Sequence, residues 1–296
     1  MTALLRPLAA TDLSPPSRRA AQRAAMLARE HGGRMALVHV LEKDAMVELR
    51  RLLGQSDVAL QARMHEQALE ALAQMARELR APDGLDVVTN LVEGSVLTTI
   101  VAQAQALGAN LLVVGARGAG FMRHWLLGAT AERLLRKTPY PILVVKQPPH
   151  QPYRRVLVPI DFSDGSAQVI RLARTLGPQA QLILLHACEL PFEGKMRFAG
   201  IEEKTIQQHR ATLQREALEQ LQCLADDTQL APTDWRPLVV HGNPSGCILE
   251  QEEVQSADLI VLGKHGMGMT EELLLGSVTK HVLGQASVDV LVVATA

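Results

Sequence analysis

The chain of 296 residues is 47% apolar, and its 30 basic and 31 acidic residues give a formal net charge of −1 at pH 7. This length suits two domains of ordinary size, and the apolar fraction excludes a largely disordered chain. The balanced charge excludes a global positive field, so we expect no nucleic acid or membrane partner. No run reaches the roughly 18 apolar residues of a membrane span, and the amino terminus lacks a signal-peptide pattern, which predicts a cytoplasmic protein.

In the first half, short apolar runs alternate with longer amphipathic stretches. A first strand is predicted to end at Thr11 and Asp12, and a second, ALVHV, ends at Val40. Helical periodicity predicts helices over residues 17–30, 60–79 and 96–107. Continuous apolar runs predict strands over residues 111–114 and 142–145. A charged stretch, residues 42–51, is interpreted as a further helix with an exposed face.

The segment KQPPHQPY, residues 146–153, separates the two halves. Proline cannot donate a backbone hydrogen bond to a helix or a strand ladder, so its three prolines predict a linker. We therefore place one domain at residues 1–147 and a second at 154–296.

The second half repeats the alternation of the first. Its first strand ends at Ile160 and Asp161, and apolar runs predict further strands over residues 182–185, 259–262 and 290–293. Helices are predicted over residues 167–176, 204–225 and 247–255, with an exposed charged face over 202–216. Strands that alternate with helices imply right-handed crossovers and a parallel sheet. Each half is thus predicted to be an α/β domain of about five parallel strands with helices on both faces.

A glycine motif occurs once in each half at the same spacing. GARGAGFMRHWLLGAT starts at Gly115 and GKHGMGMTEELLLGSV starts at Gly263, and both read G-2x-G-9x-G. The alignment pairs three glycines of the first half with three of the second: Gly115, Gly118 and Gly128 with Gly263, Gly266 and Gly276. The chain is therefore a tandem duplication whose halves are expected to fold alike.

Each glycine motif joins a strand end to a helix start. Such a loop offers unpaired backbone N–H groups and the positive end of a helix dipole, which suit phosphate groups. Glycine lets the phosphate approach the amides, although it also serves a tight turn without any ligand. The P-loop pattern is absent, and no dinucleotide fingerprint follows the first strand of either half. Arg117, Lys264 and His265 lie within these loops and are either phosphate partners or solvated cations.

The histidines and cysteines do not form a metal-binding pattern. His39 and His186 match between the halves but lie on predicted strands, where core or cleft positions are expected. His241, His265 and His281 lack the spacing of a zinc site, so we expect no metal centre. The three cysteines form no CxxC pair and are interpreted as buried free thiols: Cys188, Cys223 and Cys247.

Together, the glycine motif after the fourth strand, the strand ending VPIDFS and the second strands ending LVHV or LLHA resemble the universal stress protein family. The resemblance covers essentially the whole chain as two tandem domains. It implies the adenine nucleotide alpha hydrolase-like, Rossmann-like fold, pairing of domains through their last strands and, in one branch of the family, an ATP site. In the second half it implies that Pro159, Asp161 and Ala187 border the adenine. It assigns the ribose and phosphates to Gly263, Gly266, Gly276, Ser277 and Val278.

The matching positions of the first half depart from the family pattern. These positions are Asp12, Val40, Gly115, Gly118, Gly128 and Thr130. Ala10 replaces the proline of the first strand, and Ala129 stands where a Ser or Thr hydroxyl is expected. Alanine can neither cap a helix nor donate to a phosphate, and Thr130 points about 100° away around the helix. The first half is therefore interpreted as a degenerate site.

The resulting expectation is a cytoplasmic stress-response protein that binds ATP, with or without Mg²⁺, or AMP or another adenosine compound. Nucleotide occupancy would alter its conformation or its contacts with an unknown protein partner. No catalytic residue is assigned, because phosphoryl transfer needs metal ligands and a group that orients the nucleophile, and Asp161 and Ser277 alone are too few for this. A slow ATPase or phosphotransferase and a nucleotide-free interaction scaffold are the alternatives. Pairing of residues 142–145 with 290–293 would make an intramolecular pseudo-dimer, and two such chains could form a homodimer.

Overall fold

The computed structural model divides the chain into two compact units, Met1–Pro152 and Tyr153–Ala296. It describes residues 5–42, 58–81, 83–117, 127–190, 192–266 and 275–294. None of the helices in these residues combines the length and the apolar character that a membrane crossing requires.

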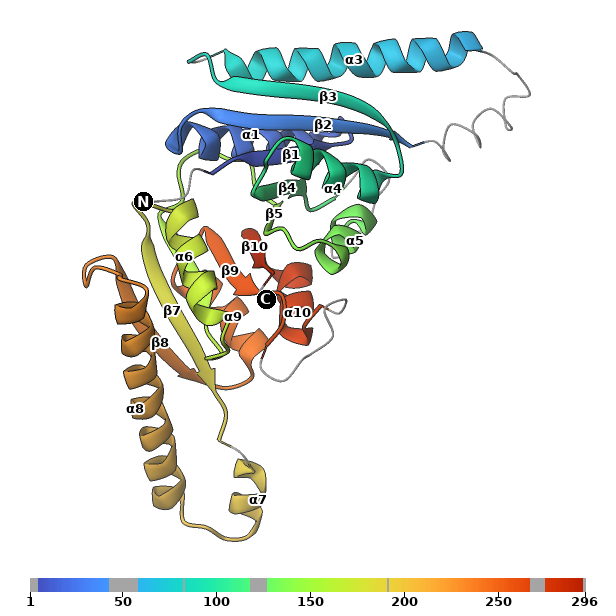
Figure 1. Cartoon of the computed structure of the whole chain (residues 1–296). Coiled ribbons are helices and arrows are strands. Elements are labelled where there is room, and N and C mark those ends of the chain that lie inside the picture. The colour runs from blue at the N-terminus through green and yellow to red at the C-terminus, as the bar shows by residue number, and fades with distance from the viewer. Residues whose placement is uncertain are drawn as a thin grey trace. The chain divides into compact units, whose positions relative to one another are not determined.

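The first unit is built on a parallel sheet with the strand order β3-β2-β1-β4-β5. Its described strands are β1 (Pro7–Thr11), β2 (Arg34–Glu42), β3 (Asp86–Gly94), β4 (Leu111–Gly115) and β5 (Ile142–Val145). Its described helices are α1 (Pro15–Glu30), α3 (Val58–Arg80), α4 (Val96–Ala106) and α5 (Ala129–Lys137). The long helix α3 lies beside β3 and β2 (Figure 1).

The second unit repeats this topology with the strand order β8-β7-β6-β9-β10. Its described strands are β6 (Arg155–Pro159), β7 (Gln181–Cys188), β8 (Trp235–His241), β9 (Leu259–Gly263) and β10 (Asp289–Val293). Its described helices are α6 (Ser166–Leu176), α7 (Glu193–Phe198), α8 (Glu203–Asp227), α9 (Pro244–Val254) and α10 (Ser277–Gln285). The prediction of two α/β domains with five-stranded parallel sheets is confirmed.

Burial explains why the strands read as continuous apolar runs. The first four residues of β4 and of β9 are all buried. Because successive side chains of a strand point to opposite faces, full burial means that both faces of the sheet are covered. The edge strand β8 contains Pro237, which edge strands tolerate because one side of their backbone has no ladder to join.

Side-chain caps and prolines set the starts of α1 and α9. The Ser14 side chain accepts a hydrogen bond from the backbone N–H of Ser17, and prolines occupy the first turn of α1. The Asn243 side chain caps α9 in the same way, accepting from the N–H groups of Ser245 and Gly246. These caps begin each helix directly beyond a strand end, where the sheet presents its carboxyl edge.

Two expectations need correction, and one short helix was not predicted. Glu42 is the last residue of β2, so no helix starts there, and the rest of the predicted helix, residues 43–51, lies outside the described residues. The short helix α7 was not predicted, because six residues are too few to show a helical period. All three cysteines were expected to be buried free thiols. All three are free, but Cys247 alone of the three is buried, whereas Cys188 is partly buried and Cys223 is exposed on α8.

Candidate functional site

A cavity of about 300 Å³ lies in the second unit at the carboxyl ends of β6, β7 and β9. Residues that follow these strands and residues at the starts of α9 and α10 line it. All eight positions singled out in the second half are among its lining residues: Pro159, Asp161, Ala187, Gly263, Gly266, Gly276, Ser277 and Val278. The tertiary structure thus brings together segments that are far apart in the sequence.

Asp161 is held at the end of β6 by a tight turn. Its Oδ1 accepts hydrogen bonds from the backbone N–H of Ser163 at 3.0 Å and from the Ser163 hydroxyl at 2.7 Å. The Ser166 hydroxyl donates to the same oxygen at 3.3 Å. Phe162, in the middle of this turn, has a left-handed φ of 60°. An ionised carboxylate only accepts hydrogen bonds, so this group suits an amino or hydroxyl group of a ligand rather than a phosphate.

Gly266 brings the loop after β9 close to this carboxylate. A Cβ added at Gly266 would lie 3.0 Å from Asp161 Oδ2, which is tighter than ordinary van der Waals contact. Any larger residue at position 266 would therefore push the Asp161 carboxylate away, and glycine avoids this contact. The ends of β6 and β9 meet at this point of the cavity.

The start of α10 is fastened to the end of β9 by two hydrogen bonds. The Thr279 hydroxyl donates to the carbonyl of Gly263 at 2.9 Å, and the N–H of Gly276 donates to the carbonyl of Lys264 at 3.0 Å. These bonds place Ser277, an exposed residue, in the first turn of α10 at the cavity. The first-turn N–H groups and the positive helix end make this part of the cavity suitable for an anionic group.

Another part of the cavity lining is mainly apolar and includes His186. His186 Nδ1 lies 2.8 Å from the carbonyl oxygen of Ile160, and a carbonyl can only accept, so Nδ1 carries the hydrogen. The His186 ring packs at 4.5 Å between centroids against Phe162. The remaining wall is formed by Val169, Leu185, Pro244, Ile248 and Leu262. Apolar walls with a few polar groups are typical of sites for flat organic ligands.

The first unit keeps the strand-end turn. Asp12 Oδ1 accepts from the backbone N–H of Ser14 at 3.1 Å and from its hydroxyl, and Leu13 has a φ of 65°. His39 Nδ1 donates to the carbonyl of Thr11 at 2.7 Å, as His186 does in the second unit. Asp12 itself is exposed, and Val40 is partly buried near the end of β2.

The start of α5 has alanine at the two positions that match Ser277 and Thr279 of α10. The N–H of Gly128 donates to the carbonyl of Ala116 at 2.9 Å, so the loop closes as it does at Gly276. Ala129 and Thr130 are both exposed, and Ala131 takes the place of Thr279. A Cβ added at Gly115 would lie 2.9 Å from the backbone of Pro16, so packing against α1 is sufficient reason for this glycine. Gly118 lies outside the described residues.

The charged residues of the glycine loops and the other histidines have different surroundings. His265 lines the cavity, Lys264 is buried and Arg117 is exposed. His241 lies 3.1 Å from Glu193 and His281 is exposed on α10. Within the part of the chain that the structure describes, no group of three or more His, Cys, Asp or Glu side chains could hold a metal ion.

Sequence reasoning did not single out three of the hydroxyl residues at the cavity. Ser163 and Ser166 orient Asp161, and Thr279 fastens α10. Ser163 belongs to the PIDFS motif, which could have identified it. The contrast between Thr279 and Ala131 was also visible in the aligned halves, whereas the role of Ser166 depends on the turn that the structure reveals.

Comparisons with known proteins agree with this architecture. The sequence profile of the Universal stress protein family matches residues 6–146 and 152–294. The chain therefore belongs to the universal stress protein family, as a member with two tandem domains.

Individual relatives match the chain over much of its length. A universal stress protein of Mycolicibacterium smegmatis is 29% identical over 299 residues, which cover 97% of this chain and 96% of that protein. A universal stress protein of Mycobacterium tuberculosis is 29% identical over 223 residues, 70% of this chain and 69% of its own. The crystal structure of a universal stress protein from Archaeoglobus fulgidus aligns with a TM-score of 0.69 and 19% identity over 98% of each chain, which shows a shared fold.

Proposed function

We propose that the second unit binds ATP or another adenine nucleotide in the cavity at the carboxyl ends of its strands. The observation that carries this proposal is the joining of two kinds of surface in one cavity of about 300 Å³. One part has apolar walls with an acceptor carboxylate, and the other has the glycine loop and the start of α10. A nucleotide needs both, one for its base and one for its phosphates.

The residues of the cavity divide between the parts of such a ligand. Pro159, Asp161 and Ala187 border the base, and the Asp161 carboxylate accepts a hydrogen bond from an amino or hydroxyl group. The ribose and phosphates lie against Gly263, Gly266, Gly276, Ser277 and Val278. Ser277 donates its hydroxyl to a phosphate oxygen. His265, in the loop after β9, is a second polar side chain at this part of the cavity. This division follows from the chemistry of each group and from the family resemblance.

The first unit is proposed to bind nucleotide weakly or not at all. It retains the Asp12 turn and the loop closure at Gly128, but Ala129 and Ala131 supply no hydroxyl. Val40, Gly115, Gly118 and Thr130 are the remaining positions at which a ligand would be held there.

Binding, rather than turnover, is the proposed activity. Asp161 Oδ1 already accepts from Ser163 and Ser166, so this carboxylate is a positioned hydrogen-bond acceptor rather than a base prepared to activate water. Nucleotide occupancy would then shift the conformation or the partner contacts of a cytoplasmic stress-response protein, as family membership suggests.

The test begins with the purified full chain. Nucleotides released by denaturation are identified by chromatography and mass spectrometry, and ATP, AMP and GTP binding to ligand-free protein is measured by calorimetry. We expect an adenine nucleotide to bind and ATP to stay largely intact over minutes with Mg²⁺ present. An absence of adenine nucleotide binding would favour the interaction scaffold. Rapid single-turnover hydrolysis that Asp161→Ala abolishes would instead establish an enzyme.

A further inference from the structure

His186, on β7, lines the cavity but has no part in the proposed division of the nucleotide. Its Nδ1 donates to the carbonyl of Ile160 at 2.8 Å, and the centroid of its ring lies 4.5 Å from that of Phe162. Ile160 and Phe162 are the two neighbours of Asp161 in the chain. His186 therefore contacts the residue before and the residue after the carboxylate that is proposed to meet the base.

The hydrogen bond to Ile160 takes the place of a backbone bond of the sheet. β6 and β7 pair in parallel with Pro159 opposite Leu185, and the Ile160 N–H donates to the Leu185 carbonyl at 2.8 Å. The next bond of a regular parallel ladder would join the Ala187 N–H to the Ile160 carbonyl. Among the described residues, the donor that the structure gives to this carbonyl is the His186 side chain instead. The carbonyl is thus satisfied, and the Ala187 N–H is left to face the cavity at the end of β6.

His186 also ties the turn that contains Asp161 to β7. The serine hydrogen bonds to the Asp161 carboxylate come from the same short segment, so they stiffen the turn without fixing its place against β7. Phe162 has a left-handed φ of 60°, a conformation that persists only where surrounding contacts hold it. His186 supplies such contacts from the neighbouring strand. It therefore sets the position of the Asp161 carboxylate relative to the Ala187 N–H.

We propose that His186 is a positioning residue through which the cavity selects adenine over guanine. This inference rests on the proposed nucleotide site. Position 6 of adenine carries an amino group that donates, whereas position 6 of guanine carries an oxygen that accepts. The adjacent ring nitrogen accepts in adenine and donates in guanine. An acceptor carboxylate at Asp161 and a donor N–H at Ala187, held at a fixed spacing, therefore match the edge of adenine and oppose the edge of guanine.

The rest of the nucleotide prevents the base from turning over to exchange its groups. The ribose and phosphates are proposed to lie at the glycine loop and the start of α10, so the edge of the base reaches β6 and β7 in one orientation. A guanine there would leave the protein donor and acceptor unpaired, which is what makes a polar site selective. The preference for adenine thus depends on the spacing that His186 sets, whereas overall affinity also depends on the phosphate contacts.

Calorimetry with ATP and GTP on the full chain tests the role of His186. His186→Leu removes the donor and keeps a bulky side chain, whereas His186→Asn retains an N–H donor near the place of Nδ1. We expect wild type to bind ATP more tightly than GTP. In His186→Leu, the ratio of the GTP to the ATP dissociation constant should fall by about tenfold or more, the factor that one hydrogen bond to a charged group provides. His186→Asn should keep most of the preference.

His39→Leu is the matched control, because it removes the same bond from the first unit. His39 Nδ1 donates to the Thr11 carbonyl at 2.7 Å, and the turn that follows contains Leu13 with a φ of 65°. This variant should lose stability to urea as His186→Leu does, but it should keep the wild-type preference for ATP. Circular dichroism checks that each variant is folded. A purely structural role of the two histidines would affect both variants alike.

Amide hydrogen exchange, measured by NMR, tests the wild-type chain without a substitution. We expect bound ATP to slow the exchange of the Ala187 N–H, since the base accepts a hydrogen bond from it. Exchange that bound ATP leaves unchanged would overturn the proposal. A ratio of dissociation constants that stays unchanged in His186→Leu would also overturn it while leaving the nucleotide site in place. A wild-type chain that binds no adenine nucleotide would instead overturn the proposed function, and this inference with it.

Discussion

Ser277 and Ala129 occupy the same position in the two halves, directly after the last glycine of each motif. The Ser277 side chain is exposed at the start of α10, where its hydroxyl is free to turn toward a ligand in the cavity. Two residues further, Thr279 fastens α10 to Gly263, and Ala131 has no group to do the same in α5. The two halves thus share a fold but differ in the hydroxyl chemistry of one helix turn.

We predict that ATP binds the second unit more tightly than the first because of this difference. A hydrogen bond to a charged group contributes about 1.5–3 kcal/mol, and each 1.4 kcal/mol is about tenfold in affinity. Ser277→Ala should therefore weaken the tight site by roughly ten- to a hundredfold in calorimetry. Ala129→Ser should strengthen or create binding in the first unit. Unchanged affinity in both variants would show that the hydroxyl does not contact phosphate.

The cysteines lead to a second prediction at this scale. Burial raises the pKa of the Cys188 and Cys247 thiols, so at neutral pH they hold little of the thiolate that reacts with maleimides. Cys223 is exposed on α8. We expect one rapid thiol in each native chain and none in Cys223→Ser, measured as the time course of maleimide labelling. Rapid labelling that persists in Cys223→Ser would contradict this expectation.

At the scale of elements, the glycines of the second unit have different surroundings. Gly284 lies inside α10, and a Cβ added there meets no heavy atom within 4 Å. Gly177 ends α6, and a Cβ there would lie 2.8 Å from the Ala180 Cβ and 3.3 Å from Val156 Cγ2. The same substitution should therefore have opposite effects at these two positions.

We predict that Gly284→Ala raises the free energy of unfolding by about 0.5–1 kcal/mol, because alanine is favoured over glycine within a helix by this amount. Gly177→Ala should lower it by about 1–3 kcal/mol through overpacking. Urea unfolding followed by circular dichroism measures both. A destabilised Gly284→Ala variant would mean that α10 has less room on this side than the structure indicates.

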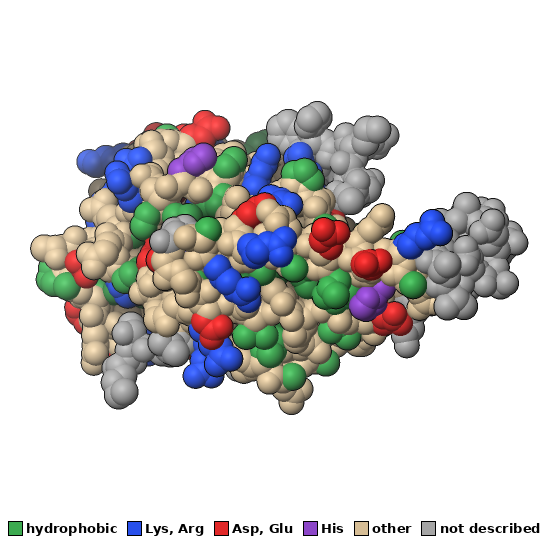
Figure 2. All heavy atoms as spheres, turned by 90° about the horizontal axis from the view of Figure 1, so that it is seen from above, with side chains coloured by type: hydrophobic (Ala, Val, Ile, Leu, Met, Phe, Trp, Pro, Cys, Tyr) green, Lys and Arg blue, Asp and Glu red, His purple; other side chains and the backbone are tan. Residues whose placement is uncertain are grey.

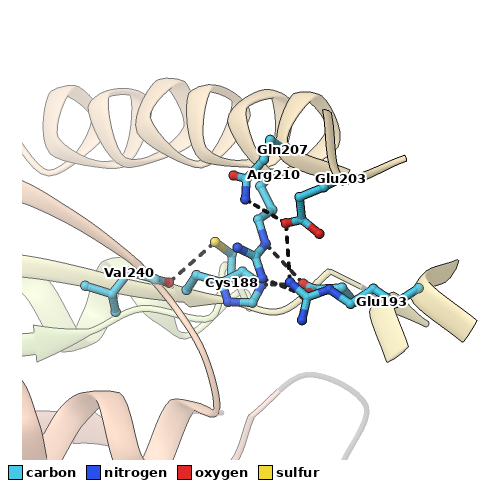
Figure 3. Close-up of polar contacts among 8 residues, drawn as sticks. Cys188, Glu193, Glu203, Gln207, Arg210 and Val240 are labelled. Carbon is cyan, nitrogen blue, oxygen red and sulfur yellow. Dashed lines mark hydrogen bonds and ion pairs between the residues drawn. The ribbon is translucent and has the colours of Figure 1, made fainter. Parts of the chain in front are cut away.

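Glu193 of α7 contacts Arg210, Arg197 and His241, and we call these contacts the Glu193 clasp (Figure 3). The clasp should depend on pH in a defined direction. Hydrogen bonding from Arg210 is the main reason that the pKa of Glu193 lies below its usual value, and the nearby positive charges act in the same direction. A carboxyl group whose pKa is lower in the folded state stabilises that state above its unfolded pKa. This stabilisation is lost as the pH falls through the lowered pKa that Glu193 has in the folded state. The contacts of Glu193 with Arg210 and Arg197 are therefore intact at neutral pH and are lost only in acid.

Methyl NMR of Met196, which lies within α7, can follow this transition. We expect its signal to move in acid, at a pH below the usual range of glutamate, as Glu193 takes up a proton. Glu193→Gln should show the acid-state signal already at neutral pH, since an amide cannot form the charged pairs. Met196→Leu assigns the resonance. An identical signal for wild type and Glu193→Gln at neutral pH would show that the clasp does not hold α7.

At the scale of the whole molecule, charge is distributed rather than concentrated. Figure 2 shows basic and acidic side chains interspersed on the face in view, in keeping with 30 basic and 31 acidic residues in the chain. A mixed surface does not produce the extended positive field that recruits nucleic acid. Contacts with partners are therefore expected to depend on local features such as the cavity of the second unit.

The relation between the two units remains a prediction. The apolar strands β5 and β10 are each the last strand of their own sheet, and an exposed apolar edge would invite aggregation. We expect them to pair, which would make the chain an internal pseudo-dimer. Hydrogen exchange of the full chain should then show protected amides along both strands. Rapid exchange of alternate amides along β5 and β10 would show two free edges.

The sequence by itself determined the tandem α/β fold. Repeated glycine spacing and apolar runs flanked by amphipathic stretches are local patterns, and they require no knowledge of distant contacts. The predicted strand over residues 142–145 coincides with β5, and the predicted helix over 96–107 differs from α4 by one residue. The glycine positions also indicated where a ligand cavity should lie, because parallel strands present their carboxyl ends on one edge of the sheet.

Only the tertiary structure decided which other side chains join these positions. Ser166 contacts Asp161 because of the left-handed turn at Phe162, and Thr279 reaches Gly263 only once α10 lies beside β9. Helix α7 has no sequence period, and it is ordered by Arg210 and His241, which come from elements far along the chain. The periodicity of apolar residues indicates which face of a helix or strand is buried, but it does not indicate which distant residues contact that face. Contacts between distant segments therefore had to come from the fold.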